Sequence, residues 1–143
     1  MNEPAARLKF VEEVAREAGR ILMDYYGTIR DIRYKGVGDI VTEADKASET
    51  LITNRLQSQF PGDAVLGEEF GLSDVQSDYC WVTDPLDGTA NYAASFPIFA
   101  VAIALLHKGT PILGVVFDPN TNRMFSATKG GGATLNGNPL RVN

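Results

Sequence analysis

Two stretches of the chain repeat apolar residues at helical spacing. The first predicts a helix over residues 4–26, with Gly27 placed to end it. A short extended piece, Ile29 to Lys35, follows. The second predicts a helix from Thr42 to Phe60, in which Thr42 is the N-cap and Asp45 resembles the acidic member of a capping box. The apolar positions are Leu8, Val11, Ala15, Ala18 and Leu22 in the first helix, and Ala44, Ala47, Leu51 and Leu56 in the second.

Short apolar runs bounded by turn residues follow the helices. Ala64 to Gly67 and Cys80 to Thr83 are predicted as strands, and each runs into an acidic pair. Beyond Pro97 the pattern is that of a β-meander with a last small hairpin. Helices followed by a meander favour an α+β fold with an antiparallel sheet. The predicted meander strands are Phe99–Leu106, Ile112–Phe117 and Arg123–Ala127, with the hairpin turn near Asn136-Gly-Asn-Pro139.

The composition narrows the classes of partner. With 18 acidic and 13 basic residues among 143, the net charge is −5, and no Lys/Arg cluster suits a nucleic-acid backbone. No apolar run is long enough to span a bilayer, so we expect no membrane partner. Cys80 is the single cysteine, which excludes an internal disulfide and favours a cytoplasmic setting. An acidic protein that handles an anionic substrate needs a bridging cation.

The segment from Trp81 to Asn91 carries the chemistry. An apolar strand leads to Asp84, and Asp87 follows after a tight turn. Two carboxylates at this spacing can converge on hard cations, and turn carbonyls can add ligands. Gly88 and Thr89 then open a helical turn, whose backbone N–H groups and hydroxyl suit a phosphate. The pattern therefore predicts adjacent metal and phosphate sites, as metal-assisted ester hydrolysis requires.

Each of these residues also has a simpler interpretation. Asp, Pro and Gly all favour turns, so the string from Asp84 to Gly88 could be only a turn. Glu68 could be a solvated loop acid, Asp45 a helix-capping residue and Lys35 a surface lysine. The combination favours a functional site, because a strand leads into the string and further acids precede it.

Taken together, these strings resemble the inositol monophosphatase family, a branch of the lithium-sensitive, Mg²⁺-dependent phosphatases. Lys35 through Asp45 resembles the family's first loop and helix start. Gly67-Glu68-Glu69 resembles its Gly-Glu-Glu element, and Asp84-Pro-Leu-Asp87-Gly-Thr89 its central metal motif. The Gly-rich turn at Lys129–Ala133 and the hairpin at Asn136-Gly137 also fall in the family's order. The resemblance implies two N-terminal helices on a mostly antiparallel sheet, the first half of a layered αβαβα sandwich.

The resemblance also implies a role for each site residue. Glu68, Asp84 and the carbonyl of Leu86 would hold one Mg²⁺, and Asp84 and Asp87 a second. Asp87, Gly88 and Thr89 would bind the substrate phosphate. Thr89, paired with Asp45, would orient and deprotonate the attacking water, with Glu69 and Lys35 as supporting residues. Two or three Mg²⁺ ions are implied for the complete enzyme, with inhibition by Li⁺ and no phosphoenzyme.

Haloacid-dehalogenase-type phosphatases carry a similar string, Asp-x-Asp-Gly-Thr, whose first Asp is the nucleophile. Here two residues, Pro85 and Leu86, separate Asp84 from Asp87. When Asp87-Gly-Thr89 is aligned to that motif, the nucleophile position falls on Pro85, which cannot attack. The spacing therefore disfavours a covalent aspartyl mechanism.

Residues 1–143 would form the metal- and phosphate-binding domain, and nothing in the chain matches the family's C-terminal substrate domain. That domain supplies a Trp-Asp-x-Ala-type motif and most substrate contacts. The chain is therefore expected to be an excised or proteolysed domain, a natural short product, or a non-catalytic metal-binding or interaction module.

The expected substrate is a small phosphorylated metabolite. Inositol monophosphate is the first candidate, and fructose 1,6-bisphosphate and 3′-phosphoadenosine 5′-phosphate are the alternatives. A homodimer is expected, or association through the surface that the absent domain would cover.

Overall fold

The computed structural model describes residues 3–29 and 37–141. Within these ranges the chain forms three helices and eight strands, in the order helix, helix, strand hairpin, and then a meander interrupted by a short helix. The elements are α1 (Pro4–Ile29), α2 (Val37–Gln59), β1 (Ala64–Gly67), β2 (Gly71–Leu72), β3 (Tyr79–Asp87), α3 (Thr89–Ala93), β4 (Ala100–His107), β5 (Thr110–Asp118), β6 (Arg123–Thr128), β7 (Gly132–Leu135) and β8 (Asn138–Leu140).

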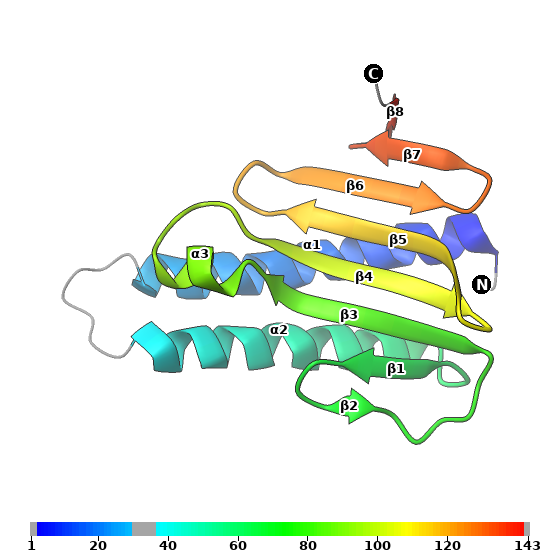
Figure 1. Ribbon diagram of the computed structural model, residues 1–143, viewed down its shortest axis with the longest axis horizontal. Helices are drawn as coiled ribbons and strands as arrows, with labels where there is room; N and C mark the ends of the chain where they lie inside the picture. Colours follow the sequence, from blue (N-terminus) through cyan, green and yellow to red (C-terminus); the bar gives the residue numbers. More distant parts are fainter. Residues whose placement is uncertain (1–2, 30–36, 142–143) are drawn as a thin grey trace.

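The described strands form one sheet in the order β2-β1-β3-β4-β5-β6-β7-β8 (Figure 1). All neighbours are antiparallel except β1 and β3, which run parallel and are separated in the chain by β2 and the segment 73–78. The sheet is thus mostly antiparallel, and the predicted α+β class with two helices packed on the sheet is confirmed.

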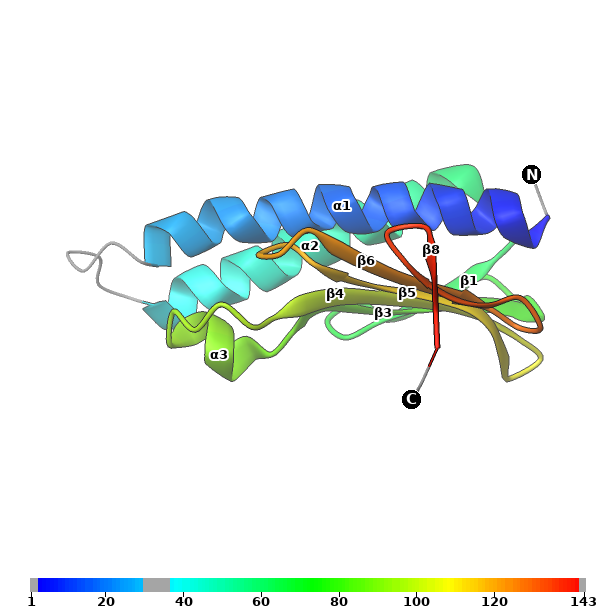
Figure 2. The ribbon, with the colours of Figure 1, turned by 90° about the horizontal axis from the view of Figure 1, so that it is seen from above.

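Both long helices lie on the same face of the sheet (Figure 2). Their apolar stripes meet the inward side chains of β3, β4 and β5, and Trp81 at the centre is fully buried. Gly19 allows α1 to approach β5 closely, since a Cβ there would stand 2.6 Å from Cε2 of the Phe117 ring. The core includes Val11, Val14, Ala18, Leu22, Ile52, Leu56, Val101, Ile103, Leu105 and Val115.

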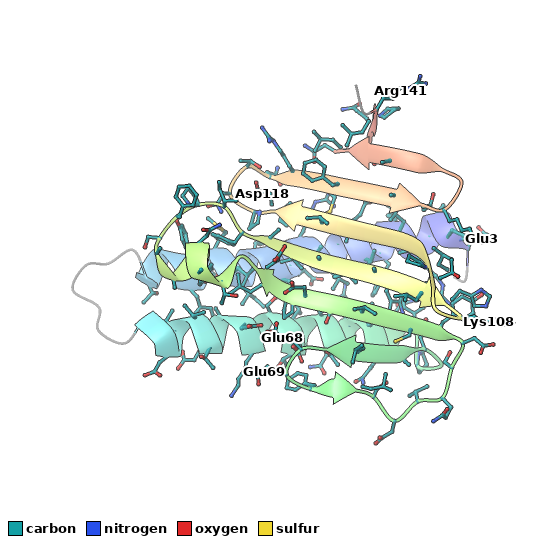
Figure 3. The ribbon with its side chains drawn as sticks, in the orientation of Figure 1. Glu3, Glu68, Glu69, Lys108, Asp118 and Arg141 are labelled. Carbon is teal, nitrogen blue, oxygen red and sulfur yellow. The ribbon has the colours of Figure 1, made fainter. Side chains whose placement is uncertain are left out.

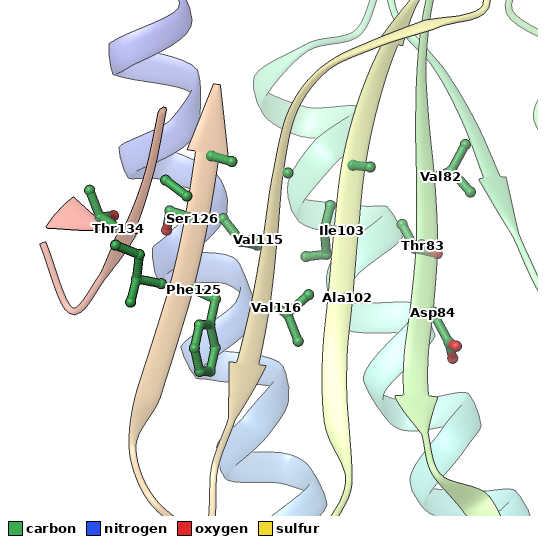
Figure 4. A pocket seen from close by; sticks show the side chains of 15 residues that line it. Val82, Thr83, Asp84, Ala102, Ile103, Val115, Val116, Phe125, Ser126 and Thr134 are labelled. Carbon is green, nitrogen blue, oxygen red and sulfur yellow. The ribbon is translucent and has the colours of Figure 1, made fainter. Parts of the chain in front are cut away.

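No described element covers the opposite face of the sheet, and α3 lies only at its end (Figures 1 and 2). A shallow apolar depression runs across this side from β3 to β8, seen in Figure 4 with the helices behind it. Val116 and Leu140 are 43% and 40% exposed there. We call this surface the bare face. Its residues include Val82, Ala102, Ala104, Gly114, Val116, Phe125, Ala127 and Leu140.

Both helix boundaries differ from the prediction. Gly27 does not end α1, which continues to Ile29, because glycine permits a helix end without enforcing one. The described part of α2 begins at Val37, so Thr42 is not an N-cap. Its hydroxyl instead donates to the carbonyl of Gly38 (3.0 Å), one turn back within the helix. Among the described residues, no helix combines the length and apolarity that a membrane crossing requires.

The predicted strands are confirmed with small shifts of their ends, and β1 agrees at both ends. β2 was not predicted, because two residues give no alternation to read. Asp87 does not follow a tight turn. β3 runs on to Asp87, and its pairing with β4 shifts register between Asp84 and Asp87, as at a β-bulge. Phe96, in the segment between α3 and β4, is 52% exposed.

Candidate functional site

The acidic residues at the ends of β1 and β3 come together because these two strands are parallel neighbours. Leu66 pairs with Val82, so continuing the register by two residues brings Glu68 level with Asp84. Side chains two apart share a face. Asp84 therefore lies on the bare-face side of the sheet, as Val82 does, and Glu68 follows the carboxyl end of the neighbouring β1. Figure 3 shows Glu68 and Glu69 where the β1–β2 hairpin turns, and Figure 4 shows Asp84 near the end of β3.

Asp45 of α2 completes the group from a third element. The pKa of Asp45 is raised from 3.8 to about 6, first by burial and then by the charges of Glu68, Glu49, Asp84 and Glu69. Its Oδ1 atom is buried and makes no hydrogen bond to any described residue. A buried, unpartnered carboxylate oxygen among other acids is costly unless a proton or a cation compensates it.

Asp84 responds to the same environment. Burial raises the pKa of Asp84, and the charges of Asp87 and Glu68 raise it further. A backbone hydrogen bond with Leu86 offsets part of this effect. The register shift after Asp84 leaves Asp87 exposed, while the Leu86 side chain is only 2% exposed. The irregular end of β3 thus places the carboxylates of Asp84 and Asp87 on either side of the buried Leu86 in the chain.

Gly88 and Thr89 begin α3, as predicted. Gly88 takes the left-handed conformation (φ 90°), and a Cβ there would stand 3.0 Å from the carbonyl oxygen of Ile98. Tyr92 fixes the short helix, because its buried hydroxyl donates to the carbonyl of Leu22 in α1 (2.6 Å). The position of Thr89, which is exposed, therefore depends on a contact between α3 and α1.

The carboxylates of Asp45, Glu68, Asp84 and Asp87 influence one another electrostatically but do not converge. In the part of the chain that the structure describes, no group of three or more acidic, His or Cys side chains is close enough to hold a metal ion. Mutual repulsion opposes such convergence until a cation offsets it. Lys35 lies outside the described residues.

Ser48 and Glu49 were not predicted as site residues, yet both contact the loops that carry the acids. Ser48 donates to the carbonyl of Pro85 (2.8 Å), and the Glu49 carboxylate accepts from the backbone N–H groups of Glu69 and Phe70. The available signal was two adjacent polar residues on the helix face that also carries Asp45.

Comparison with known proteins identifies the family of this chain. Residues 3–143 match the inositol monophosphatase family. The chain is 43% identical over 147 residues to the chloroplastic phosphatase IMPL1 of Arabidopsis thaliana, covering 97% of this chain and 39% of that protein. It is 40% identical over 137 residues to the inositol-1-monophosphatase of Synechocystis sp., covering 94% of this chain and 48% of that protein.

The fold is also found among solved structures. The inositol monophosphatase from Anabaena (Nostoc) sp. PCC 7120 superimposes with a TM-score of 0.84 at 38% identity, covering 97% of this chain and 50% of that one. This chain therefore spans about half the length, or less, of these relatives.

Proposed function

Because this chain belongs to the inositol monophosphatase family, we propose that it is the metal- and phosphate-binding domain of a Mg²⁺-dependent phosphatase. Inositol monophosphate is the first candidate substrate, since relatives named inositol monophosphatase match nearly the whole chain. The observation that carries the proposal is that Asp45, Glu68 and Asp84, from separate parts of the chain, are near enough for their charges to act on one another. Burial and these charges raise the pKa of Asp45 to about 6.

The residues present fit Mg²⁺. Carboxylate and carbonyl oxygens are the donors that this ion prefers, and Asp45 Oδ1 is buried without a hydrogen bond from any described residue. Glu68, Asp84 and the carbonyl of Leu86 would hold one ion, and Asp84 and Asp87 a second. Bound Mg²⁺ lowers the pKa of water and stabilises charge on phosphoryl and leaving oxygens.

The other residues would place the substrate and move the proton. Asp87, Gly88 and Thr89 would bind the phosphate, and the positive φ of Gly88 frees its backbone for close approach. The Thr89 hydroxyl, paired with Asp45, would orient the attacking water. Asp45 would then accept the proton as a general base. Glu69 and Lys35 would support this arrangement.

A substrate panel tests the proposal. Inositol monophosphate, fructose 1,6-bisphosphate and 3′-phosphoadenosine 5′-phosphate are supplied with Mg²⁺ to the chain, alone and joined to a relative's C-terminal half. We expect release of inorganic phosphate from one of them by the joined form, with inhibition by Li⁺. Turnover of none of the three would contradict the phosphatase assignment.

The second candidate function is a catalytically silent metal-binding or interaction module. One observation favours it: in the part of the chain that the structure describes, the acids do not converge as a metal site. Calorimetric titration with Mg²⁺ beside the phosphatase assay separates the two. Binding without turnover in the joined form supports the silent module. Turnover by the chain alone would contradict the need for a second domain.

A further inference from the structure

One face of α2 contacts both segments that carry the acidic residues, which are the turn after β1 and the end of β3. Asp45, Ser48 and Glu49 are spaced at i, i+3 and i+4, so they share this face. Ser48 and Glu49 are both 0% exposed, although each is polar. A buried carboxylate costs free energy unless hydrogen bonds replace its hydration. The hydrogen-bond partners of these two side chains must therefore explain their burial.

Glu49 accepts hydrogen bonds from the loop after β1. Its Oε1 lies 2.9 Å from the backbone nitrogen of Glu69, and its Oε2 lies 2.7 Å from that of Phe70. These two N–H groups directly follow Glu68 in the chain. The carboxylate thus fixes the backbone that carries Glu68 through charge-assisted hydrogen bonds, which are stronger than neutral ones.

Ser48 contacts the end of β3 as a hydrogen-bond donor, whereas Glu49 is an acceptor. Its hydroxyl donates to the Pro85 carbonyl at 2.8 Å, between Asp84 and Asp87. The register shift in β3 breaks the ladder with β4 in this stretch. Ser48 supplies a donor where the sheet pairing is interrupted, as Glu49 supplies acceptors where β1 ends.

Gly67 has no side chain and so leaves room for the Glu49 carboxylate. A Cβ there would stand 2.7 Å from Oε2 and 2.9 Å from Cδ of Glu49. Gly67 is not among the described glycines with positive φ, so a side chain there would act through its contact with the Glu49 carboxylate and not through the backbone conformation. An alanine at this position would displace the Glu49 carboxylate from the two N–H groups without changing any charge.

We propose that Ser48, Glu49 and Gly67 are positioning residues that hold the turn at Glu68 and the Asp84–Asp87 end of β3 against α2 in the orientation that metal binding requires. The inference rests on the proposed function. Removing a partner that orients a metal ligand typically weakens affinity about 10–100-fold. We expect losses of that size for Glu49→Gln, Gly67→Ala and Ser48→Ala, although none of the three residues binds the metal.

The experiment is a calorimetric titration of the chain and its variants with Mg²⁺ alone. Glu43→Gln is the matched control for Glu49→Gln, because it removes the same charge from an exposed position of α2. We expect it to change affinity less than about threefold. Gly67→Ala displaces the Glu49 carboxylate but leaves its charge in place. It also keeps the proposal testable if Glu49→Gln does not fold. Circular dichroism at the titration temperature verifies folding.

Amide hydrogen exchange of Glu69 and Phe70 gives an independent measurement. We expect faster exchange at both amides in Glu49→Gln and Gly67→Ala, with unchanged exchange in the centre of β4. Wild-type affinity in folded Gly67→Ala and Ser48→Ala would overturn the positioning role while leaving the proposed function intact. Absence of Mg²⁺ binding by the wild-type chain would overturn both.

Discussion

At the residue scale, burial and mutual repulsion both make it harder for Asp45 and Asp84 to stay ionised. Burial raises the pKa of Asp45, and the charges of four other carboxylates raise it further. Burial and neighbouring charge both act on Asp84 as well. A cation bound among these carboxylates would offset the repulsion.

Asp87→Asn tests whether Asp87 is a metal ligand or only the last residue of β3. Asparagine keeps the shape of aspartate but removes its charge. In a form of the enzyme that turns over substrate, we expect activity to fall by orders of magnitude with an unchanged unfolding midpoint. The exposed position of Asp87 explains why folding should tolerate the change. Activity that survives would show that Asp87 has only a structural role at the end of β3.

The raised pKa of Asp45 predicts a pH-dependent stability without metal. The folded chain binds this proton more tightly than the unfolded chain, whose pKa is near 3.8. The stabilisation is therefore complete below about pH 4 and is lost as pH rises through about 6. The full shift corresponds to about 3 kcal/mol, which solvent screening at this partly exposed side chain reduces to about 1 kcal/mol.

Urea unfolding in chelator-treated buffer from pH 4 to pH 8 measures this effect. We expect Asp45→Asn, which cannot ionise, to gain about 1 kcal/mol over the wild type between the two ends of the range. Saturating Mg²⁺ should raise wild-type stability at pH 8, since the ion favours ionised carboxylates. Parallel pH profiles of the two proteins without metal would contradict the assignment.

At the element scale, the sequence was most informative where local chemistry decides the outcome. β1 and the last hairpin follow from apolar runs and turn residues, and the start of α3 follows from Gly88-Thr89. The start of α2 did not follow, because Thr42 satisfies the same local rule as a cap while donating within the helix. Ser48 and Glu49 could not be assigned, since their partners lie 37 and 20 or more residues away.

Two glycines of α1 provide a matched test of helix packing. Alanine favours a helix interior by about 1 kcal/mol over glycine. At Gly19, however, the new Cβ would stand 2.6 Å from the buried ring of Phe117, and overpacking typically costs about 1–3 kcal/mol. At Gly27 a Cβ would have no atom within 4 Å apart from its two chain neighbours and the backbone of its own helix.

We therefore expect opposite signs from the same substitution in the same helix. Gly19→Ala should lower the free energy of unfolding by about 1–2 kcal/mol. Gly27→Ala should raise it by about 0.5 kcal/mol, because the position lies near the helix end. Equilibrium urea denaturation followed by circular dichroism measures both. Stabilisation by Gly19→Ala would show that α1 is not held close to β5.

At the scale of the whole molecule, the helices cover only one side of the sheet. Strands with both faces apolar are typical of sheets covered on both sides. Here β4 and β5 send Val101, Ile103 and Val115 to the helices and Ala102, Ala104 and Val116 to the bare face. The small residues among them leave room for close packing of another layer. We propose that the second half of a complete enzyme forms that layer, because each relative extends well beyond the matched region.

Without that layer, we expect the chain to self-associate through the bare face, since a contiguous exposed apolar surface favours association. Val116→Lys places a charge at an exposed position in the middle of this face and should give a monomer by light scattering with an unchanged unfolding midpoint. Thr50→Lys adds the same charge at an exposed position of α2 and should leave association intact. Association that persists in Val116→Lys but is lost in Ile98→Lys would place the contact instead at Ile98, which is 59% exposed beyond α3. A wild-type chain that stays monomeric at high concentration would contradict the expectation and favour an autonomous short protein.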